Sequence, residues 1–429
     1  MKKFIVTLLV VFMALSFVMA NGAKEAEPTG PVTIELWSSL TGSKAKVFDG
    51  QVAKFNETQD EVIVNVIHQG GYDMLRQKVA AAANAKNLPT LLICDYLDVA
   101  YYAQLGVLED VSNILSEEVI GDYYEGMLKD LTVDGVLYGI PYNRSTQGFY
   151  VNNDLLRKAG IDHIATTWDE FKEQCIQMKT LGDDYYLGYA FFHQFLFDGI
   201  AYTWGAEIAT PEGEIKFLEP EMKEMFHYFQ DLYYDGYLLM QPVLSGGFEE
   251  QNGAFFDGKV ATVFQTTSFT SSAVTLLEGT DWSYEFTPAK DGMNAVTIGG
   301  GNFTICAGVS DSQREAAEKF LNYMSSDEIV AEFFMSTGNL PVKKSVLESD
   351  LVQEFLEKNP SYKTIVAQLD YAKAAPATTK NIRNVYNRVN DMISRIILNG
   401  EDVDTVLAEY QNEFQAEFDE MKANGTFIY

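Results

Sequence analysis

Strand-like and helix-like segments alternate along the early part of this chain. Residues 32–37 (VTIELW) alternate apolar and polar side chains as a half-buried strand does, and residues 62–67 (VIVNVI) repeat the pattern. Between them, residues 48–55 place apolar side chains at helical spacing. An alanine-rich helix is predicted at 74–86 and a third strand at 91–94. Strands that alternate with helices in this way predict βαβ units, and therefore an α/β fold with mostly parallel sheets flanked by helices.

The same alternation begins again after residue 142. The later predicted elements are a strand at 148–151, helices at 153–159, 168–181 and 222–234, a strand at 295–298, a helix at 313–325 and a helical tail over 381–410. A chain of 429 residues is too long for one core and suits two domains. Because no long linker separates the blocks, we expect two lobes joined by strand crossings, with a ligand cleft between them. The predicted first lobe comprises residues 32–142 and 300–341, and the second comprises residues 143–299 and 342–429.

The first twenty residues predict an export signal peptide. Lys2 and Lys3 precede a mostly apolar stretch over residues 4–17, and Val18-Met19-Ala20 (VMA) gives the small-x-small pattern at which signal peptidase cuts. Residues 21–31 are expected to form a flexible leader. No cysteine follows the cleavage site, so a lipid-anchored N-terminus is not predicted. An uncleaved membrane anchor would need a longer apolar run. We therefore expect the protein in the periplasm, or more generally outside the cytoplasm.

The chain is strongly acidic. It has 31 basic and 61 acidic residues, and removal of residues 1–20 takes away two lysines and no acids, which leaves a formal charge of −32. Such a charge argues against nucleic acid and anionic lipid as partners. An anionic ligand would need a local cation or converging backbone amides to hold it. We expect a monomer.

The sequence carries no recognisable catalytic, metal or cofactor motif. Cys94, Cys175 and Cys306 are far apart, so neither a disulfide framework nor a metal site is expected. Residues 253–259 (GAFFDGK) match the start of a phosphate-binding loop, but Val260 has no hydroxyl for magnesium and a strand pattern follows where a helix is required. We therefore expect no cofactor and no enzymatic activity.

Several short stretches occur in an order and spacing that are specific when taken together. They are 34–39 (IELWSS), 71–73 (GYD), 88–90 (LPT), 141–146 (PYNRST), 150–152 (YVN), 167–170 (TWDE), 255–261 (FFDGKVA), 298–301 (IGGG), 336–341 (STGNLP) and 382–383 (IR). Over residues 34–398 the chain resembles the periplasmic solute-binding proteins of sugar-type ABC importers, and most of all the members that bind glycerol-3-phosphate. The resemblance implies a two-lobed periplasmic-binding-protein fold of class II, a small-molecule ligand in the cleft, and the membrane permease subunits of an ABC importer as partners.

The resemblance also implies which residues bind the ligand. They are Trp37, Ser39, Tyr72, Asp95, Arg144, Ser145, Phe192, Phe195, Trp204, Ser268, Gly300, Asn339 and Arg383. Tyr72 and Ser145 are implied to face the ligand. Gly300 is implied to donate its backbone N–H, and Arg383 to bind a phosphate. Arg144 is the second candidate cation, and for both arginines a structural, ion-paired role stays open.

Two departures from the family pattern leave the ligand open. Asn339 stands where the family has a tyrosine, and its amide suits a hydroxyl group. Phe192 and Phe195, with Trp204 further on, stand where the family has closely spaced tryptophans. Aromatic faces suit either a glycerol chain or a sugar ring. The expected ligand is glycerol-3-phosphate, a glycerophosphodiester, or a neutral sugar or oligosaccharide.

Two further classes of protein stay open. A secreted hydrolase would use paired acids such as Asp73 and Asp95. A chemoreceptor module would bind the same kind of solute but would signal instead of feeding a transporter.

Overall fold

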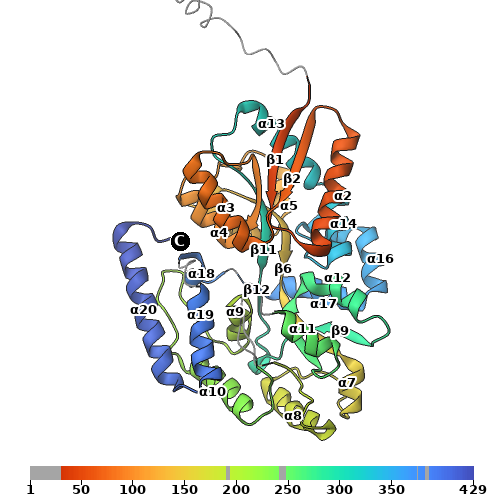
Figure 1. The fold of residues 1–429 in the computed structure, drawn as a ribbon, viewed down its shortest axis with the longest axis vertical. Coiled ribbons are helices and arrows are strands. Elements are labelled where there is room, and N and C mark those ends of the chain that lie inside the picture. The colour runs from red at the N-terminus through yellow and green to blue at the C-terminus, as the bar shows by residue number, and fades with distance from the viewer. Residues whose placement is uncertain (1–29, 190–193, 241–247, 374, 382–385) are drawn as a thin grey trace, which may run out of the picture.

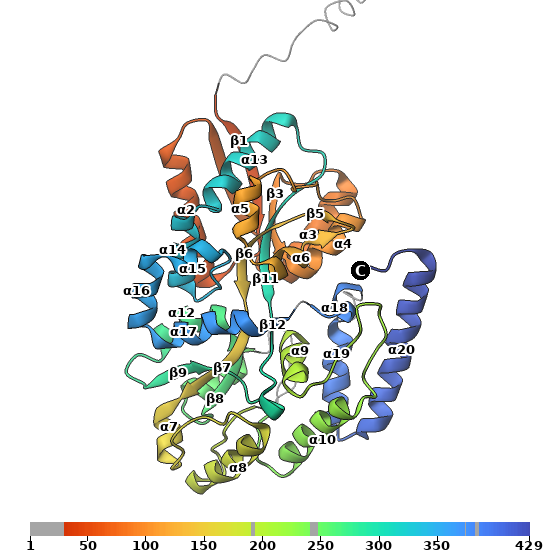
Figure 2. The ribbon, with the colours of Figure 1, turned by 180° about the vertical axis from the view of Figure 1, so that it is seen from behind.

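The chain folds into two α/β units that are joined by strands running between them (Figure 1). The computed structural model describes residues 30–189, 194–240, 248–373, 375–381 and 386–429. The first unit is built around a five-stranded sheet and the second around a three-stranded sheet. In Figure 2, β6 (Ile140–Ser145) and β11 (Gly299–Ile305) run together from the first sheet toward the second unit. The units therefore meet where these two strands leave the first sheet.

The five-stranded sheet has the order β2-β1-β3-β11-β6. Its strand β1 (Val32–Ser38) lies parallel to β2 (Val62–His68) and to β3 (Leu91–Asp95), with Ile34 opposite Val64. The strand β11 enters between β3 and β6 and is antiparallel to both. Helices cover this sheet on both faces, which explains why β3 is a continuous apolar run in the sequence.

The three-stranded sheet has the order β8-β7-β9. Its central strand β7 (Gln147–Asn152) is antiparallel to β8 (Thr262–Thr266) and to β9 (Trp282–Glu285). Only Thr146 separates β6 from β7, so one extended stretch serves both sheets. The short paired strands are β4 (Thr132–Val133) with β5 (Val136–Leu137) and β10 (Val296–Thr297) with β12 (Ala372–Lys373).

The sheets are more mixed than the sequence predicts. The parallel pairs are β1 with β2, β1 with β3, and β10 with β12, whereas the second sheet and the β11 pairs are antiparallel. The alternation of strands and helices indicates which segments are extended. It does not indicate the direction in which a strand arriving from the other unit enters a sheet.

Several helices begin at capping side chains that the sequence supplies. Thr167 accepts a hydrogen bond from the Glu170 amide at the start of α8, and Ser310 with Gln313 forms a capping box at α13.

In chain order the α-helices are α2 (Gly42–Thr58), α3 (Tyr72–Ala85), α4 (Tyr96–Gln104), α5 (Glu117–Asp122), α6 (Glu125–Lys129), α7 (Asn153–Lys158), α8 (Trp168–Met178), α9 (Gln194–Thr203), α10 (Pro220–Tyr234), α11 (Phe248–Phe256), α12 (Thr270–Leu276), α13 (Asp311–Met324), α14 (Asp327–Thr337), α15 (Lys344–Glu348), α16 (Asp350–Lys358), α17 (Pro360–Ala367), α18 (Ala377–Asn381), α19 (Tyr386–Ile393) and α20 (Val403–Asn424). Short 3-10 turns are η1 (Lys179–Leu181), η2 (Thr267–Phe269), η3 (Lys290–Gly292) and η4 (Gln368–Tyr371).

The C-terminal segment, predicted to be helical over 381–410, contains several helical elements separated by a turn. A π-helical turn, Ser394–Leu398, follows α19, and the chain then turns at Gly400 before α20 begins. Gly400 has a φ of 68°, and a Cβ there would lie 2.6 Å from the hydroxyl oxygen of Tyr234. Asp402 then caps α20 by accepting from the Thr405 amide at 2.9 Å. The helical character is as predicted for these elements, and the break that the sequence did not indicate arises because a left-handed glycine ends one helix and a new N-cap starts the next.

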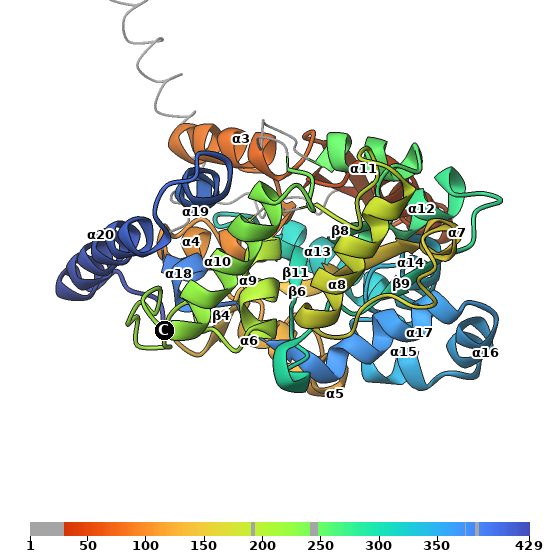
Figure 3. The ribbon, with the colours of Figure 1, turned by 90° about the horizontal axis from the view of Figure 1, so that it is seen from below.

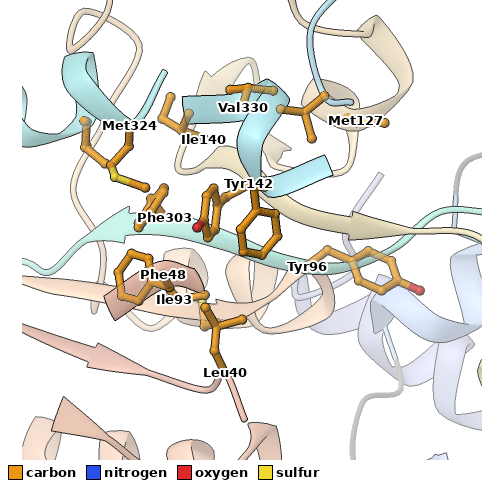
Figure 4. Close-up of a cluster of buried hydrophobic side chains, with 14 of the residues drawn as sticks. Leu40, Phe48, Ile93, Tyr96, Met127, Ile140, Tyr142, Phe303, Met324 and Val330 are labelled. Carbon is orange, nitrogen blue, oxygen red and sulfur yellow. The ribbon is translucent and has the colours of Figure 1, made fainter. Parts of the chain in front are cut away.

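The buried hydrophobic side chains form two large cores. The first surrounds the five-stranded sheet and also includes Tyr150, Val263 and Tyr284 from the three-stranded sheet, so it continues across the junction of the units. In the first core (Figure 4), Phe48 of α2 and Tyr142 of β6 pack with Phe303 of β11, and the ring centroids of Tyr142 and Phe303 are 4.6 Å apart. The Tyr142 hydroxyl donates to Gln51 Oε1 at 2.7 Å, so the buried phenol keeps a hydrogen-bond partner. These contacts fix α2 against the strands that carry the candidate site.

The helices that follow residue 342 divide between the two cores. Val346 of α15 and Val352 of α16 belong to the first core, and α17 lies beside β9. Phe414 and Phe418 of α20 belong to the second core. Seen from below, α20 and α16 lie at opposite edges of the molecule (Figure 3). The predicted lobe limits stay a prediction.

Candidate ligand-binding site

The strands that join the two units approach each other very closely at Gly300. This residue lies opposite Arg144 in the β11–β6 pair and has a φ of 113°. A Cβ on Gly300 would lie 2.0 Å from the carbonyl oxygen of Asn143. Only glycine fits, because any side chain would both strain the backbone and overlap that oxygen. Gly300, a predicted site residue, therefore fixes the spacing of the crossing strands.

Three polar side chains from distant parts of the chain meet beside this crossing. Asn143 donates from Nδ2 to the Tyr72 hydroxyl at 3.2 Å, and Asn339 donates from Nδ2 to Asn143 Oδ1 at 2.6 Å. Asn339 also donates to the Arg144 carbonyl at 3.0 Å. Its own Oδ1 is buried and has no hydrogen-bond partner within the described residues. We call Tyr72, Asn143 and Asn339 the crossing cluster; Asn143 is the member that the sequence did not single out.

Tyr72 and Asp95 are positioned by the starts of two helices. Tyr72 opens α3 directly after Gly71, whose φ is 108°. Asp95 ends β3 and caps α4 by accepting from the Leu97 amide at 3.1 Å. Burial, and then the carboxylate of Asp95, raise the pKa of Tyr72 above its ordinary value. Tyr72 is therefore a neutral phenol at pH 7 that can both donate and accept a hydrogen bond.

Arg144 is fully buried and already paired. Its Nη2 lies 2.8 Å from Asp130 Oδ2, and its Nη1 donates to Asn302 Oδ1 at 3.0 Å. Burial raises the pKa of Asp130 although Arg144 acts in the opposite direction. This placement agrees with the ion-paired alternative for Arg144 and not with a cation open to a ligand.

Ser268 is joined to the other unit by a lysine that the sequence analysis did not single out. Lys44, in the first turn of α2, donates from Nζ to Ser268 Oγ at 3.3 Å. Beside this contact, the hydroxyl oxygens of Ser43 and Ser271 are 2.7 Å apart. One signal could have found Lys44: it follows the carboxyl end of β1, and α/β sheets bind ligands beyond the carboxyl ends of their strands.

Two more predicted serines and one tryptophan lie on or near these strands. Ser145 ends β6, and Ser39 follows β1; both side chains are buried. The Ser39 hydroxyl has no hydrogen-bond partner among the residues that the structure describes. Trp37 is half-buried on β1 and donates from Nε1 to Glu35 at 2.5 Å. Ser145 lies on the crossing strand β6, whereas Trp37 and Ser39 lie at the carboxyl end of β1, which β3 separates from β11. The hydrogen bonds of the crossing cluster run to other groups.

Of the aromatic residues predicted to replace the family's tryptophans, Trp204 has a described side chain, and it lies away from the crossing cluster. Trp204 is 4% exposed and stacks on Trp168 in the second core, with ring centroids 5.8 Å apart. That is the placement of a core ring. Phe192 and Arg383 lie outside the described residues, and so does the side chain of Phe195.

The acids considered for a hydrolase, Asp73 and Asp95, each have another partner in the described structure. Within the described residues, no group of three or more His, Cys, Asp or Glu residues could hold a metal ion. Asp73 is exposed and ion-paired with Arg76, while Asp95 serves as a helix cap, so these two acids are not a free pair. Residues 253–259 lead from α11 into β8 rather than into a helix, unlike a phosphate-binding loop.

All three cysteines are buried thiols. Burial raises the pKa of each of Cys94, Cys175 and Cys306 above its ordinary value, which makes them small core residues rather than nucleophiles. Among the helices in the described ranges, none is both long and apolar enough to span a bilayer.

Known proteins similar to this chain share most of its length and not only a motif. Residues 50–382 match the family model described as "Bacterial extracellular solute-binding protein". The chain is 24% identical over 368 residues to the sn-glycerol-3-phosphate-binding periplasmic protein UgpB of Brucella melitensis, which covers 81% of this chain and 83% of the relative. Its identity to the protein of the same name from Escherichia coli K12 is 23% over 365 residues, covering 79% and 80%.

Solved structures are similar over nearly the same length. UgpB from Mycobacterium tuberculosis, in complex with glycerophosphocholine, has a TM-score of 0.82 and 23% identity, covering 92% of this chain and 99% of its own. The cyclic alpha-maltosyl-1,6-maltose binding protein from Arthrobacter globiformis has a TM-score of 0.78 and 23% identity, covering 91% and 100%. These likenesses confirm the predicted two-lobed periplasmic-binding-protein fold. Because the family model matches most of its length, the chain belongs to the bacterial extracellular solute-binding proteins.

Proposed function

We propose that this protein is the extracytoplasmic binding component of an ABC importer and that it captures a small polyhydroxylated solute between its two units. The observation that carries the proposal is the crossing cluster, whose three members come from distant segments and meet where strands pass between the units. Polar side chains held at the junction of two rigid units suit a protein that closes around its ligand. Membership of the solute-binding family supports the same role.

The mechanism proposed is hinge closure. A ligand that contacts both units stabilises the closed arrangement over the open one by the contacts that closure adds. The closed form then docks on the permease subunits, and the partner ATPase supplies the energy for transport. The proposed lobes are residues 32–142 with 300–341 and residues 143–299 with 342–429, so the hinge comprises the three chain crossings at 142–143, 299–300 and 341–342.

The ligand class that we propose first is a phosphorylated glycerol derivative, either glycerol-3-phosphate or a glycerophosphodiester. The names of the sequence relatives and the ligand of the mycobacterial structure support this class. Arg383 is proposed as the cation that binds the phosphate, with Ser145, Ser268 and the Gly300 amide as further donors.

A neutral sugar is the second candidate, and the crossing cluster itself favours it. The Oδ1 of Asn339, which is buried and unpartnered within the described residues, can accept a hydrogen bond from a ligand hydroxyl. That bond would recover the free energy lost by burying the oxygen alone. Similar structures include a maltosyl-maltose binder, which supports the same alternative.

Titration calorimetry with the chain from residue 21 to 429 tests the proposal. We expect sn-glycerol-3-phosphate or glycerophosphocholine to bind with a Kd in about the micromolar range or below. Arg383→Ala should weaken that binding by about 30-fold or more, because it leaves the phosphate without its main cation. Arg157→Ala is the matched control, since Arg157 is an exposed arginine paired with Asp154 and Asp281 on the surface.

Two results would change the assignment. Heat released by maltose but not by either phosphate ester would transfer the ligand to the neutral-sugar class and leave the binding role intact. Turnover of a glycoside or phosphoester under the same conditions would contradict a protein that only binds.

We also propose a signal-peptide cleavage site and an oligomeric state. Cleavage before Asn21 predicts that mass spectrometry of the exported protein finds an N-terminus at that residue. We also propose a monomer, which light scattering would show as one chain of less than 48.0 kDa after signal removal.

A further inference from the structure

Lys44 is a cation that links the two units through a hydroxyl group. It lies in the first turn of α2, in the first unit, and its ammonium donates to Ser268 Oγ of the second unit at 3.3 Å. In the part of the chain that the structure describes, no Asp or Glu forms an ion pair with it. Among the described residues, this half-buried ammonium therefore has a hydroxyl partner and no counter-ion.

Two other cations of the first unit, Lys54 and Arg144, are paired with acids. Lys54, further along α2, pairs with Glu328, and Arg144 pairs with Asp130. Acids outnumber basic residues by 61 to 31 in this chain, so an acid partner for Lys44 would be easy to supply. Burial lowers the pKa of Lys44, which means that keeping the charge in this place costs free energy. An anion that enters between the units would recover that cost.

The groups around Lys44 are hydrogen-bond donors suited to an oxyanion. Ser268 Oγ, which contacts the ammonium, lies 2.8 Å from Thr266 Oγ1, so a second hydroxyl is hydrogen-bonded to the partner of Lys44. The buried hydroxyl of Ser39, in the connection between β1 and α2, has no partner among the described residues. Hydroxyls grouped with an ammonium fit a phosphate better than a metal cation.

We propose that Lys44 is a specificity-determining residue of the ligand site and that its ammonium binds the anionic group of the ligand, a phosphate monoester or diester. Ser268 would hold the same group from the second unit, so one phosphate links both units across their junction. This inference rests on the proposed function and adds to it a charged residue that selects phosphorylated over neutral ligands.

Calorimetry on the whole mature protein tests the inference with three variants: Lys44→Gln, Lys44→Arg and Lys46→Gln. Lys46 is exposed two positions further along the same helix, so Lys46→Gln removes the same charge from the long-range field of the protein. Lys44→Gln should weaken binding of sn-glycerol-3-phosphate by about 10- to 100-fold, and Lys44→Arg should restore it to within about threefold. Lys46→Gln should leave it within about twofold, and no variant should change the affinity for a neutral sugar that the wild type binds.

Each other outcome overturns the inference in a recognisable way. Unchanged affinity of Lys44→Gln for glycerol-3-phosphate would remove Lys44 from the site while the proposed function stands. If Lys44→Gln weakened the binding of phosphorylated and neutral ligands equally, Lys44 would only stabilise the closed arrangement of the two units and would not select charged ligands. A wild-type protein that binds neutral sugars and no phosphate ester would overturn both this inference and the first ligand class. Melting curves of all variants check that each is folded.

Discussion

At the scale of single residues, the buried charges of this protein differ in how completely they are paired. Arg144 and Asp130 are 0% and 1% exposed at their side chains and are 2.8 Å apart, so each is the counter-ion of the other. Removing one partner leaves an uncompensated charge in the interior, which is far more costly than removing both. The pair therefore holds β6 to the loop after α6 only as long as it stays intact.

Arg144→Met should lower the free energy of unfolding by about 3–5 kcal/mol, measured by urea denaturation. The double variant with Asp130→Leu should recover most of that loss, because neither charge then remains buried alone. If the single variant unfolds at the wild-type urea concentration, the ion pair does not stabilise the crossing.

Asp198 of α9 presents the opposite case, a buried acid with an unsatisfied oxygen. It is 2% exposed, and its Oδ2 has no hydrogen-bond partner among the described residues. Burial raises the pKa of Asp198 well above its ordinary value. The carboxyl of Asp198 therefore holds its proton more tightly in the folded protein than in the unfolded chain. As a result, the free energy of unfolding falls as the pH rises from about 4 through the raised pKa.

Asp198→Asn should remove that decline, since the amide cannot ionise. We expect the variant to be more stable than the wild type by about 1–3 kcal/mol at pH 7, and the difference to shrink toward about pH 4. Melting curves of both proteins over that pH interval and up to about pH 8 measure the effect. A constant difference across the whole range would mean that Asp198 has the same pKa in the folded protein and in the unfolded chain, which would contradict the raised pKa.

At the scale of the elements, the crossing of β6 and β11 depends on a glycine. Gly300→Ala should destabilise the protein by about 2–4 kcal/mol, because the new Cβ meets the Asn143 carbonyl and the φ of 113° is strained for alanine. Gly308→Ala is the control: Gly308 has a φ of 85°, but a Cβ added there would meet nothing within 4 Å, so it isolates the strain from the overlap. Equal losses in the two variants would show that the overlap contributes nothing.

The same scale shows how far the sequence can predict this fold. The limits of β1, β2, β3 and α3 are predicted to within about two residues, because apolar spacing is a local property. The restart of the tail at Gly400 is missed because a strong apolar repeat continues on both sides of it. The direction of β11 is missed because its partners, β3 and β6, are far away in the chain.

The candidate site is predictable only where it rests on short motifs. Tyr72 and Asn339 follow glycines in stretches that resemble the family, and both enter the crossing cluster. The sequence analysis misses Lys44 because its partner Ser268 is 224 positions away and neither residue belongs to a recognisable anion-binding motif. Trp204 is a core ring because α9 turns it toward Trp168, which no local pattern of aromatic residues reveals.

At the scale of the whole molecule, the two units are joined by a few strands and by side-chain contacts that a ligand can reinforce. The hydrogen bonds of Ser43 with Ser271 and of Lys44 with Ser268 lie between α2 and the segment after β8. Small-angle X-ray scattering should therefore give a smaller radius of gyration at saturating ligand than without ligand. Identical scattering curves, with binding shown by calorimetry, would contradict hinge closure.

The place of β11 in the first sheet also affects how the protein is made. In the order β2-β1-β3-β11-β6, the strand β6 reaches the rest of its sheet only through β11, which begins at Gly299. A chain that leaves the ribosome from its N-terminus therefore has β3 as an open edge and β6 without a neighbour in this sheet until residue 305 has emerged. The first unit cannot finish folding before most of the polypeptide has been synthesised. Under the proposed export, this strand order would keep the chain incompletely folded for longer and so favour translocation.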